Sequence, residues 1–78
     1  MLAVIIPAYN EERTLPEVIR RVVSLSIVTQ VIVVSDGSTD QTPAIIRQFQ
    51  QSHGVIGVVC PLNGGKGAAI QAGLRYVN

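Results

Sequence analysis

The chain has 78 residues, 47% of them hydrophobic and 14% charged, and its formal net charge is +1. This length allows one small domain, and a charged fraction well below the usual value of about 25% predicts the core piece of a larger protein. The composition argues against a nucleic-acid partner (no basic run), an internal disulfide or zinc site (one Cys, one His) and a membrane span (no apolar run near 18 residues).

The first third of the chain predicts a strand followed by a helix. Leu2 to Ile6 is an apolar run, and Pro7 is expected to close the strand because it lacks an N–H. Pro16 falls near the first turn of the helix, where proline is tolerated. Five apolar residues then recur at helical spacing and predict the inner stripe: Leu15, Val18, Ile19, Val22 and Val23.

The second strand is the clearest element in the sequence. It begins at Gln30 or Val31 and ends at Val34, and its β-branched residues predict burial on both faces. A helix follows, with Thr42 expected at the N-cap and Pro43 at the first helical position. Its predicted inner stripe is Ile45, Ile46 and Phe49.

The third unit repeats this order. Val55 to Cys60 predicts a strand, and a helix is expected from around Lys66 to the end, with Ile70, Leu74 and Val77 on its inner face. Strands alternating with helices predict an α/β fold, a three-layer α/β/α arrangement around a parallel sheet.

Polar loops follow all three predicted strands, and a parallel sheet brings them to one edge. These loops are residues 7–12, 35–40 and 63–67. Tyr9 can pack on a base, and Lys66 can neutralise phosphate. A carboxylate such as Asp36 can accept a hydrogen bond from a base N–H or a ribose hydroxyl. The set suits a nucleoside with phosphates.

Each of these residues also has a purely structural interpretation. Asp36-Gly37 is a common turn signal, and Asp40 or Thr42 can simply cap a helix. Glu11 and Glu12 would suit the positive end of a helix dipole. Tyr9 can be an ordinary half-buried loop aromatic and Lys66 a solvated lysine.

Two phosphate-binding motifs do not fit. A P-loop would need glycine at Cys60 and Ser or Thr at Gly67. The dinucleotide fingerprint would need glycine or alanine at Ile70, and it would belong in the first unit instead of the third.

Three segments together resemble the amino-terminal part of a family 2 glycosyltransferase with the GT-A fold. They are Val4 to Glu12, Val33 to Thr42, and Asn63 to Ala69, and with them the resemblance covers essentially the whole chain. The most similar subgroup comprises dolichyl-phosphate mannosyltransferase-like and other polyprenyl-phosphate glycosyltransferases. The resemblance implies the strand order 3-2-1.

The resemblance also implies roles for individual residues in binding a UDP- or GDP-sugar. Asp36 would accept a hydrogen bond from the base, and Lys66 would lie near the nucleotide or order its loop. Ser35 stands where the family usually has the first of two aspartates. The residues implied to line the base and ribose pocket are Pro7, Ala8, Tyr9 and Glu11, with Val34 as a wall.

Members of the family bind Mg2+ or Mn2+ through an Asp-x-Asp motif on the next strand, and these 78 residues contain no such motif. The resemblance therefore implies that the metal ligands and catalytic carboxylates lie beyond Asn78, and that this chain alone is inactive. The intact parent would be an inverting glycosyltransferase with an acceptor such as a polyprenyl phosphate. We expect it in the cytoplasm or at the cytoplasmic face of a membrane.

Two other interpretations stay open. The chain can be a non-catalytic α/β interaction module that associates with itself, or a nucleotide-binding enzyme such as a nucleotidyltransferase. The latter is less favoured because no glycine-rich loop follows the first strand. The apolar strand Leu2 to Ile6 is expected at an open sheet edge, which predicts a homo-oligomer.

Overall fold

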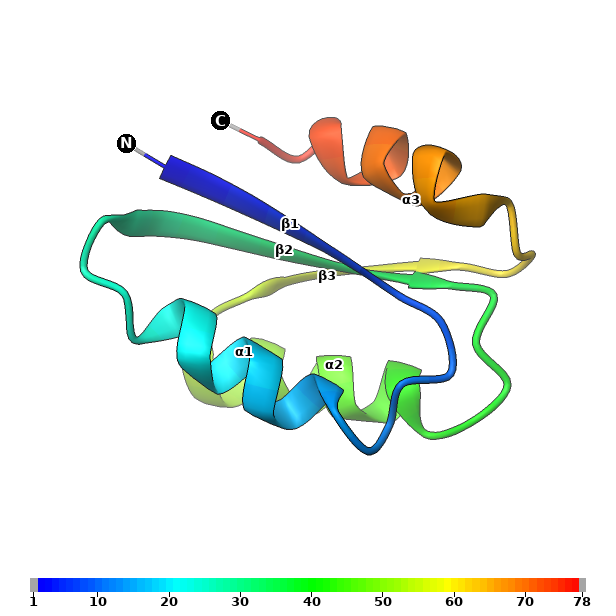
Figure 1. Ribbon diagram of the computed structural model, residues 1–78, viewed down its shortest axis with the longest axis horizontal. Coiled ribbons are helices and arrows are strands. Elements are labelled where there is room, and N and C mark those ends of the chain that lie inside the picture. Colours follow the sequence, from blue (N-terminus) through cyan, green and yellow to red (C-terminus); the bar gives the residue numbers. More distant parts are fainter. Residues whose placement is uncertain (1, 78) are drawn as a thin grey trace.

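The fold is a parallel sheet with helices on both faces (Figure 1). The computed structural model describes residues 2–77, with the exception of the Lys66 side chain. The strands are β1 (Leu2–Ala8), β2 (Val28–Asp36) and β3 (Ile56–Cys60), in the order β1-β2-β3. The α/β/α architecture and the order 3-2-1, which is the same order read from the other edge, are therefore confirmed.

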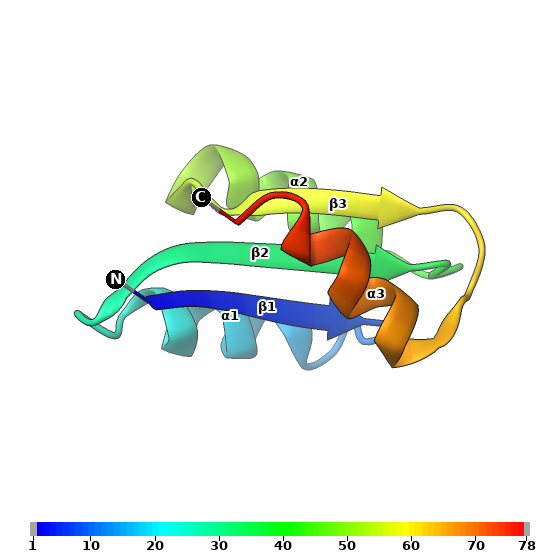
Figure 2. The same ribbon diagram turned by 90° about the horizontal axis from the view of Figure 1, so that it is seen from above.

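Three helices cover the sheet unequally. Figure 1 places α1 (Leu15–Val23) and α2 (Thr42–His53) together on one face. The other face carries α3 (Gly65–Leu74) alone, lying obliquely across the strands (Figure 2).

The central strand β2 divides the core into two layers. Because successive strand residues point to opposite faces, Val31 and Val33 pack with α1 and α2, whereas Ile32 and Val34 pack beneath α3. Every residue from 31 to 36 is buried. The predicted burial of β2 on both faces is correct.

The first two strands are longer than predicted. β1 continues through Pro7, which pairs in register with Val34, and ends at Ala8. An edge strand tolerates proline because one side of its backbone has no ladder partner, so the prediction that Pro7 closes the strand was wrong. β2 likewise extends in both directions and includes Asp36 as its last residue, paired with Cys60.

Three details of α1 and α2 also differ from the predictions. Val18 is exposed, so the inner stripe of α1 depends on Leu15 and Ile19, with Val22 and Val23 partly buried. Thr42 is the first residue of α2 and Gln41 occupies the N-cap position, so Pro43 is the second helical residue and not the first. The Thr42 hydroxyl forms a hydrogen bond to another loop, which a cap assignment from local sequence misses.

The inner face of α3 was predicted wrongly. Ile70 and Leu74 are 42% and 55% exposed, whereas Ala69 is fully buried and Gly73 is buried beside it. Small residues let the helix approach the sheet closely, and the large side chains then face outward. Val77 does pack against the sheet, but it lies after the end of the helix.

Gly73 marks this close approach and provides a test of it. A Cβ at Gly73 would lie 2.7 Å from Cγ2 of Ile5 and 3.2 Å from Cγ2 of Val34. Gly73→Ala should therefore lower the free energy of unfolding by about 1–3 kcal/mol in chemical denaturation, because overpacking displaces the helix.

Gly67→Ala is the matched control, since a Cβ at Gly67 in the same helix has nothing within 4 Å. It should be neutral or stabilise by up to about 1 kcal/mol, because alanine favours the helix. Equal effects of the two substitutions would contradict the close approach of α3 to β1 and β2.

Candidate functional site

The carboxyl ends of all three strands meet at one edge of the sheet (Figure 2). The loops that leave β1, β2 and β3 therefore lie together, as the sequence predicted. In open parallel sheets this edge is the usual place for a ligand.

A small hollow opens at this edge where β1 and β2 end. Its lining residues are Pro7, Ala8, Tyr9, Glu11 and Asp36, all of them predicted site residues. Its volume of about 30 Å³ is far below the roughly 300–1,000 Å³ of a complete small-molecule pocket. These five residues therefore form at most one wall of the candidate site.

The other two predicted residues lie apart from this hollow. Val34 is fully buried beneath α3 and is not among the lining residues. Lys66 belongs to the first turn of α3, and its side chain lies outside the described part of the structure.

Asp36 joins the hollow to the loop after β3. Asp36 is 5% exposed, and its Oδ1 accepts a hydrogen bond of 2.9 Å from the backbone N–H of Gly64. Among the described residues, no hydrogen bond involves Oδ2. One oxygen of Asp36 is thus held by the protein, and the second is not engaged by any described residue.

Gly37 brings the second and third loops into contact. Its N–H donates to the carbonyl oxygen of Cys60 at 2.8 Å, and its φ is +70°, in the left-handed region that favours glycine. A Cβ at this position would lie 2.4 Å from the backbone nitrogen of Asn63. The turn interpretation of Asp36-Gly37 and the site interpretation are therefore compatible.

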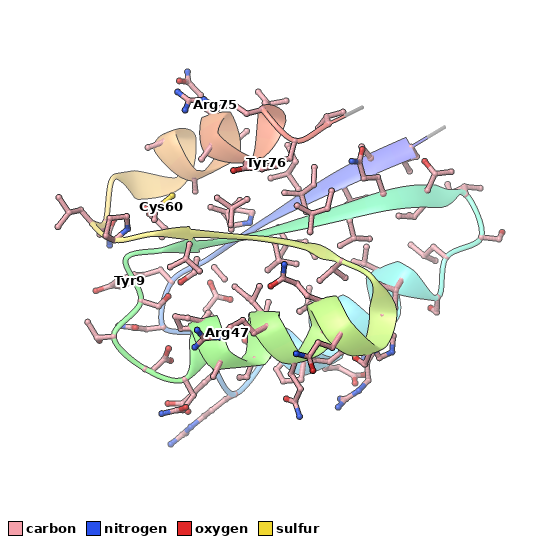
Figure 3. The ribbon with its side chains drawn as sticks, turned by 180° about the vertical axis from the view of Figure 1, so that it is seen from behind. Tyr9, Arg47, Cys60, Arg75 and Tyr76 are labelled. Atoms are coloured by element: carbon pink, nitrogen blue, oxygen red, sulfur yellow. The ribbon has the colours of Figure 1, made fainter. Side chains whose placement is uncertain are left out.

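Tyr9 and Glu11 contribute the exposed side of the wall. Tyr9 is 46% exposed and lies at the same end of the molecule as Cys60 (Figure 3). Glu11 precedes α1, whose first-turn acidic residue is Glu17. Glu11 thus lies before the N-terminus of α1 and also lines the hollow with Asp36, so both the site interpretation and the helix-dipole interpretation stay open.

Asp40 holds the loops and does not line the hollow. Its carboxylate accepts from the N–H groups of Thr42 at 2.9 Å and Glu12 at 3.3 Å. Desolvation would raise the pKa of Asp40, but hydrogen bonds from Thr42 and Glu12 outweigh it and hold the pKa below its usual value. Sequence reasoning considered Asp40 only as a helix cap and missed its contact with Glu12.

The described residues do not form a metal centre. No group of three or more His, Cys, Asp or Glu side chains in residues 2–77 is placed to hold an ion. In the same part of the chain, none of the helices is both long and apolar enough to cross a membrane.

Comparison with known proteins identifies similar sequences over nearly the whole chain. The profile of the family described as Glycosyl transferase family 2 matches residues 3–78. A dolichyl-phosphate beta-glucosyltransferase of Trichomonas vaginalis is 34% identical over 97% of this chain and 27% of its own length. An undecaprenyl-phosphate 4-deoxy-4-formamido-L-arabinose transferase of Salmonella choleraesuis is 37% identical over 99% of this chain and 25% of its own length. The chain thus spans about a quarter of these curated relatives.

Solved structures show the same fold. A mannosyltransferase from Pyrobaculum calidifontis, in complex with GDP-Man and Mn2+, superposes with a TM-score of 0.86 at 28% identity, over 97% of this chain and 24% of that one. S. aureus TarS superposes with a TM-score of 0.83 at 27% identity, with the same coverage of 97% and 24%.

The contact between the second and third loops can be tested at Gly37. Gly37→Ala adds both an unfavourable φ and a clash with Asn63, so it should lower the free energy of unfolding in chemical denaturation. Gly54→Ala is the matched control, because Gly54 has a φ of +69° with nothing within 4 Å of its Cβ position.

We expect Gly37→Ala to cost about 2 kcal/mol more than Gly54→Ala, since only the former must displace a loop backbone. Equal losses would show that backbone strain accounts for the whole effect and that the loops are not in tight contact.

Proposed function

We propose, from the premise that this chain belongs to glycosyl transferase family 2, that it binds a UDP- or GDP-sugar at the carboxyl edge of its sheet. The observation that carries the proposal is the Asp36 carboxylate: Asp36 lines the hollow, Gly64 fixes one carboxylate oxygen, and no hydrogen bond among the described residues uses the other. A base N–H is a suitable donor to that oxygen, and a charge-assisted hydrogen bond of this kind is strong.

The neighbouring residues suit the rest of a nucleoside. The exposed Tyr9 ring offers a face on which a base can stack. Glu11 can accept hydrogen bonds from ribose hydroxyls, and Pro7 and Ala8 supply apolar contact. Lys66, at the start of α3, would lie near the nucleotide or order its loop.

The reaction that we propose is transfer of the sugar, with inversion, to an acceptor such as a polyprenyl phosphate. The names of the dolichyl-phosphate and undecaprenyl-phosphate relatives support this acceptor class. The contribution of this chain is recognition of the nucleotide, because its described residues do not fit a divalent metal. The ligands for Mg2+ or Mn2+, and the catalytic carboxylates, would come from residues outside these 78, and the chain alone would not catalyse transfer.

Substitution of Asp36 tests the proposed base contact. Asp36→Asn keeps the shape and an oxygen for the Gly64 N–H but removes the charge. The Kd for UDP or GDP, measured by calorimetric titration of the full chain, should rise about tenfold or more, as expected for a hydrogen bond to a charged group.

Glu17→Gln is the control, because Glu17 is an exposed carboxylate on α1 whose only ion-pair partner in the described part of the chain is Arg21. The Kd of Glu17→Gln for UDP or GDP should equal that of the unmodified chain. Addition of Mn2+ should change neither of these two Kd values. If the folded chain binds neither nucleotide at millimolar concentration, the proposed function is wrong.

A second candidate function, a self-associating module, is favoured by the open edge of the sheet. β1 lies at that edge and pairs only with β2 among the described strands. An unpaired strand edge is a template for another chain, so we propose a homo-oligomer formed through β1. The two proposals share β1, because Pro7 and Ala8 at its carboxyl end line the hollow, whereas Leu2 lies at its start.

Light scattering over a range of concentrations tests this association. Leu2→Lys places a charge at the exposed start of β1 and should shift the chain toward monomer. Val59→Lys places the same charge on β3, at the opposite edge, and should have no effect. A monodisperse monomer at all concentrations would contradict the proposal.

A further inference from the structure

The wall of the hollow is held in place by side chains from a different loop. The segment from Ala8 to Glu12 carries three of the five lining residues. Its backbone forms hydrogen bonds with side chains of the segment from Ser38 to Thr42, about thirty positions along the chain. We define these two segments as the wall segment and the support segment.

Contacts of Ser38 and Asn10 hold the first part of the wall segment. The Ser38 hydroxyl accepts from the N–H of Asn10 at 3.1 Å and donates to the carbonyl of Ala8 at 3.4 Å. In return, Oδ1 of Asn10 accepts from the N–H of Thr39 at 2.8 Å. Asn10 has a φ of +49°, a left-handed conformation that asparagine adopts more readily than most residues.

Thr42 fixes the backbone of Glu11. Its Oγ1 accepts from the Glu11 N–H at 3.0 Å, while the Glu11 carbonyl accepts from Leu15 at 2.9 Å and Thr14 at 3.2 Å. Both backbone groups of Glu11 are thus engaged. Its side chain is exposed and forms no hydrogen bond or ion pair within the described part of the chain.

Thr42 itself cannot contact a ligand in the hollow. It is 0% exposed and lies in the first turn of α2, whereas the lining residues belong to β1, β2 and the loop before α1. Any effect of Thr42 on binding must therefore be transmitted through the wall segment.

We propose that Ser38, Asp40 and Thr42 are positioning residues that hold the wall segment ready for the nucleotide, with Thr42 acting on binding through Glu11. This inference rests on the proposed function and explains part of the affinity for the nucleotide. A wall segment already fixed before binding loses less conformational entropy when the nucleotide arrives, so each support contact strengthens binding without touching the ligand.

The test compares Thr42→Val, which removes the hydroxyl, with Thr42→Ser, which keeps it. Thr42→Val should raise the Kd for UDP or GDP about threefold to tenfold, as expected for the loss of one hydrogen bond. The Kd of Thr42→Ser should stay within about twofold of the value for the unmodified chain. Ser52→Ala is the control, because among the described residues the Ser52 hydroxyl on α2 forms a hydrogen bond only with the adjacent His53.

A double-mutant cycle with Glu11→Ala separates positioning from general stability. If Thr42 acts through Glu11, Thr42→Val should weaken binding by much less in the Glu11→Ala background than alone. Amide exchange at Glu11 should also accelerate in Thr42→Val, since that N–H loses its acceptor. Equal losses of affinity in both backgrounds would overturn the inference.

The outcomes distinguish this inference from the proposed function. If Asp36→Asn weakens nucleotide binding but folded Thr42→Val binds as tightly as the unmodified chain, the inference is wrong and the proposed function stands. If the unmodified chain binds neither nucleotide, both fail. If Thr42→Val does not fold, Ser38→Ala replaces it as the test, because Ser38 is less buried than Thr42. An unchanged Kd of Ser38→Ala for UDP or GDP would overturn the inference.

Discussion

The alternation of side chains along β2, buried on both faces, is the constraint from which the rest of the structure follows. Val33 and Ser35 share the face toward α1 and α2, and Val34 and Asp36 share the face toward α3. A shift by one residue would exchange these two sets, bringing Asp36 into the apolar layer against α1 and α2. The register of one central strand thus determines where the carboxylate of the candidate site lies.

The same alternation explains the different surroundings of Ser35 and Asp36. Ser35 is 0% exposed, and its hydroxyl oxygen has no hydrogen-bond partner among the described residues. An ionised carboxylate at position 35 would pay a large desolvation cost in the same surroundings. Asp36 instead receives the Gly64 N–H at the edge of the sheet. A small neutral residue therefore suits position 35 in this chain.

Glycine and side-chain hydrogen bonds act together at the candidate site. Gly37 lets the loop after β2 approach the loop after β3, and the support segment binds the backbone of the loop after β1. Three loops from distant parts of the sequence are thereby linked around Asp36. Hydrogen bonds that are made before a ligand arrives leave fewer groups to be ordered on binding, which is the physical basis for regarding this edge as a preorganised site.

The sequence alone determined the order of strands and helices, the parallel sheet and the gathering of three polar loops at one edge. These follow from hydrophobic periodicity and from chain connectivity, both of which can be read locally. The resemblance to a known family, which is also a property of the sequence, singled out seven residues, and five of them line the hollow.

Only the tertiary structure decided the position of Pro7 within β1, the inner face of α3 and the use of Thr42 as a support for Glu11. Each depends on a partner far along the chain. Pro7 is tolerated because β1 lies at an edge, and α3 turns its small residues inward because Gly73 meets Ile5. The Thr42 hydroxyl accepts from Glu11, 31 positions earlier. Local periodicity carries no information about such contacts, because they exist only once the layers have packed.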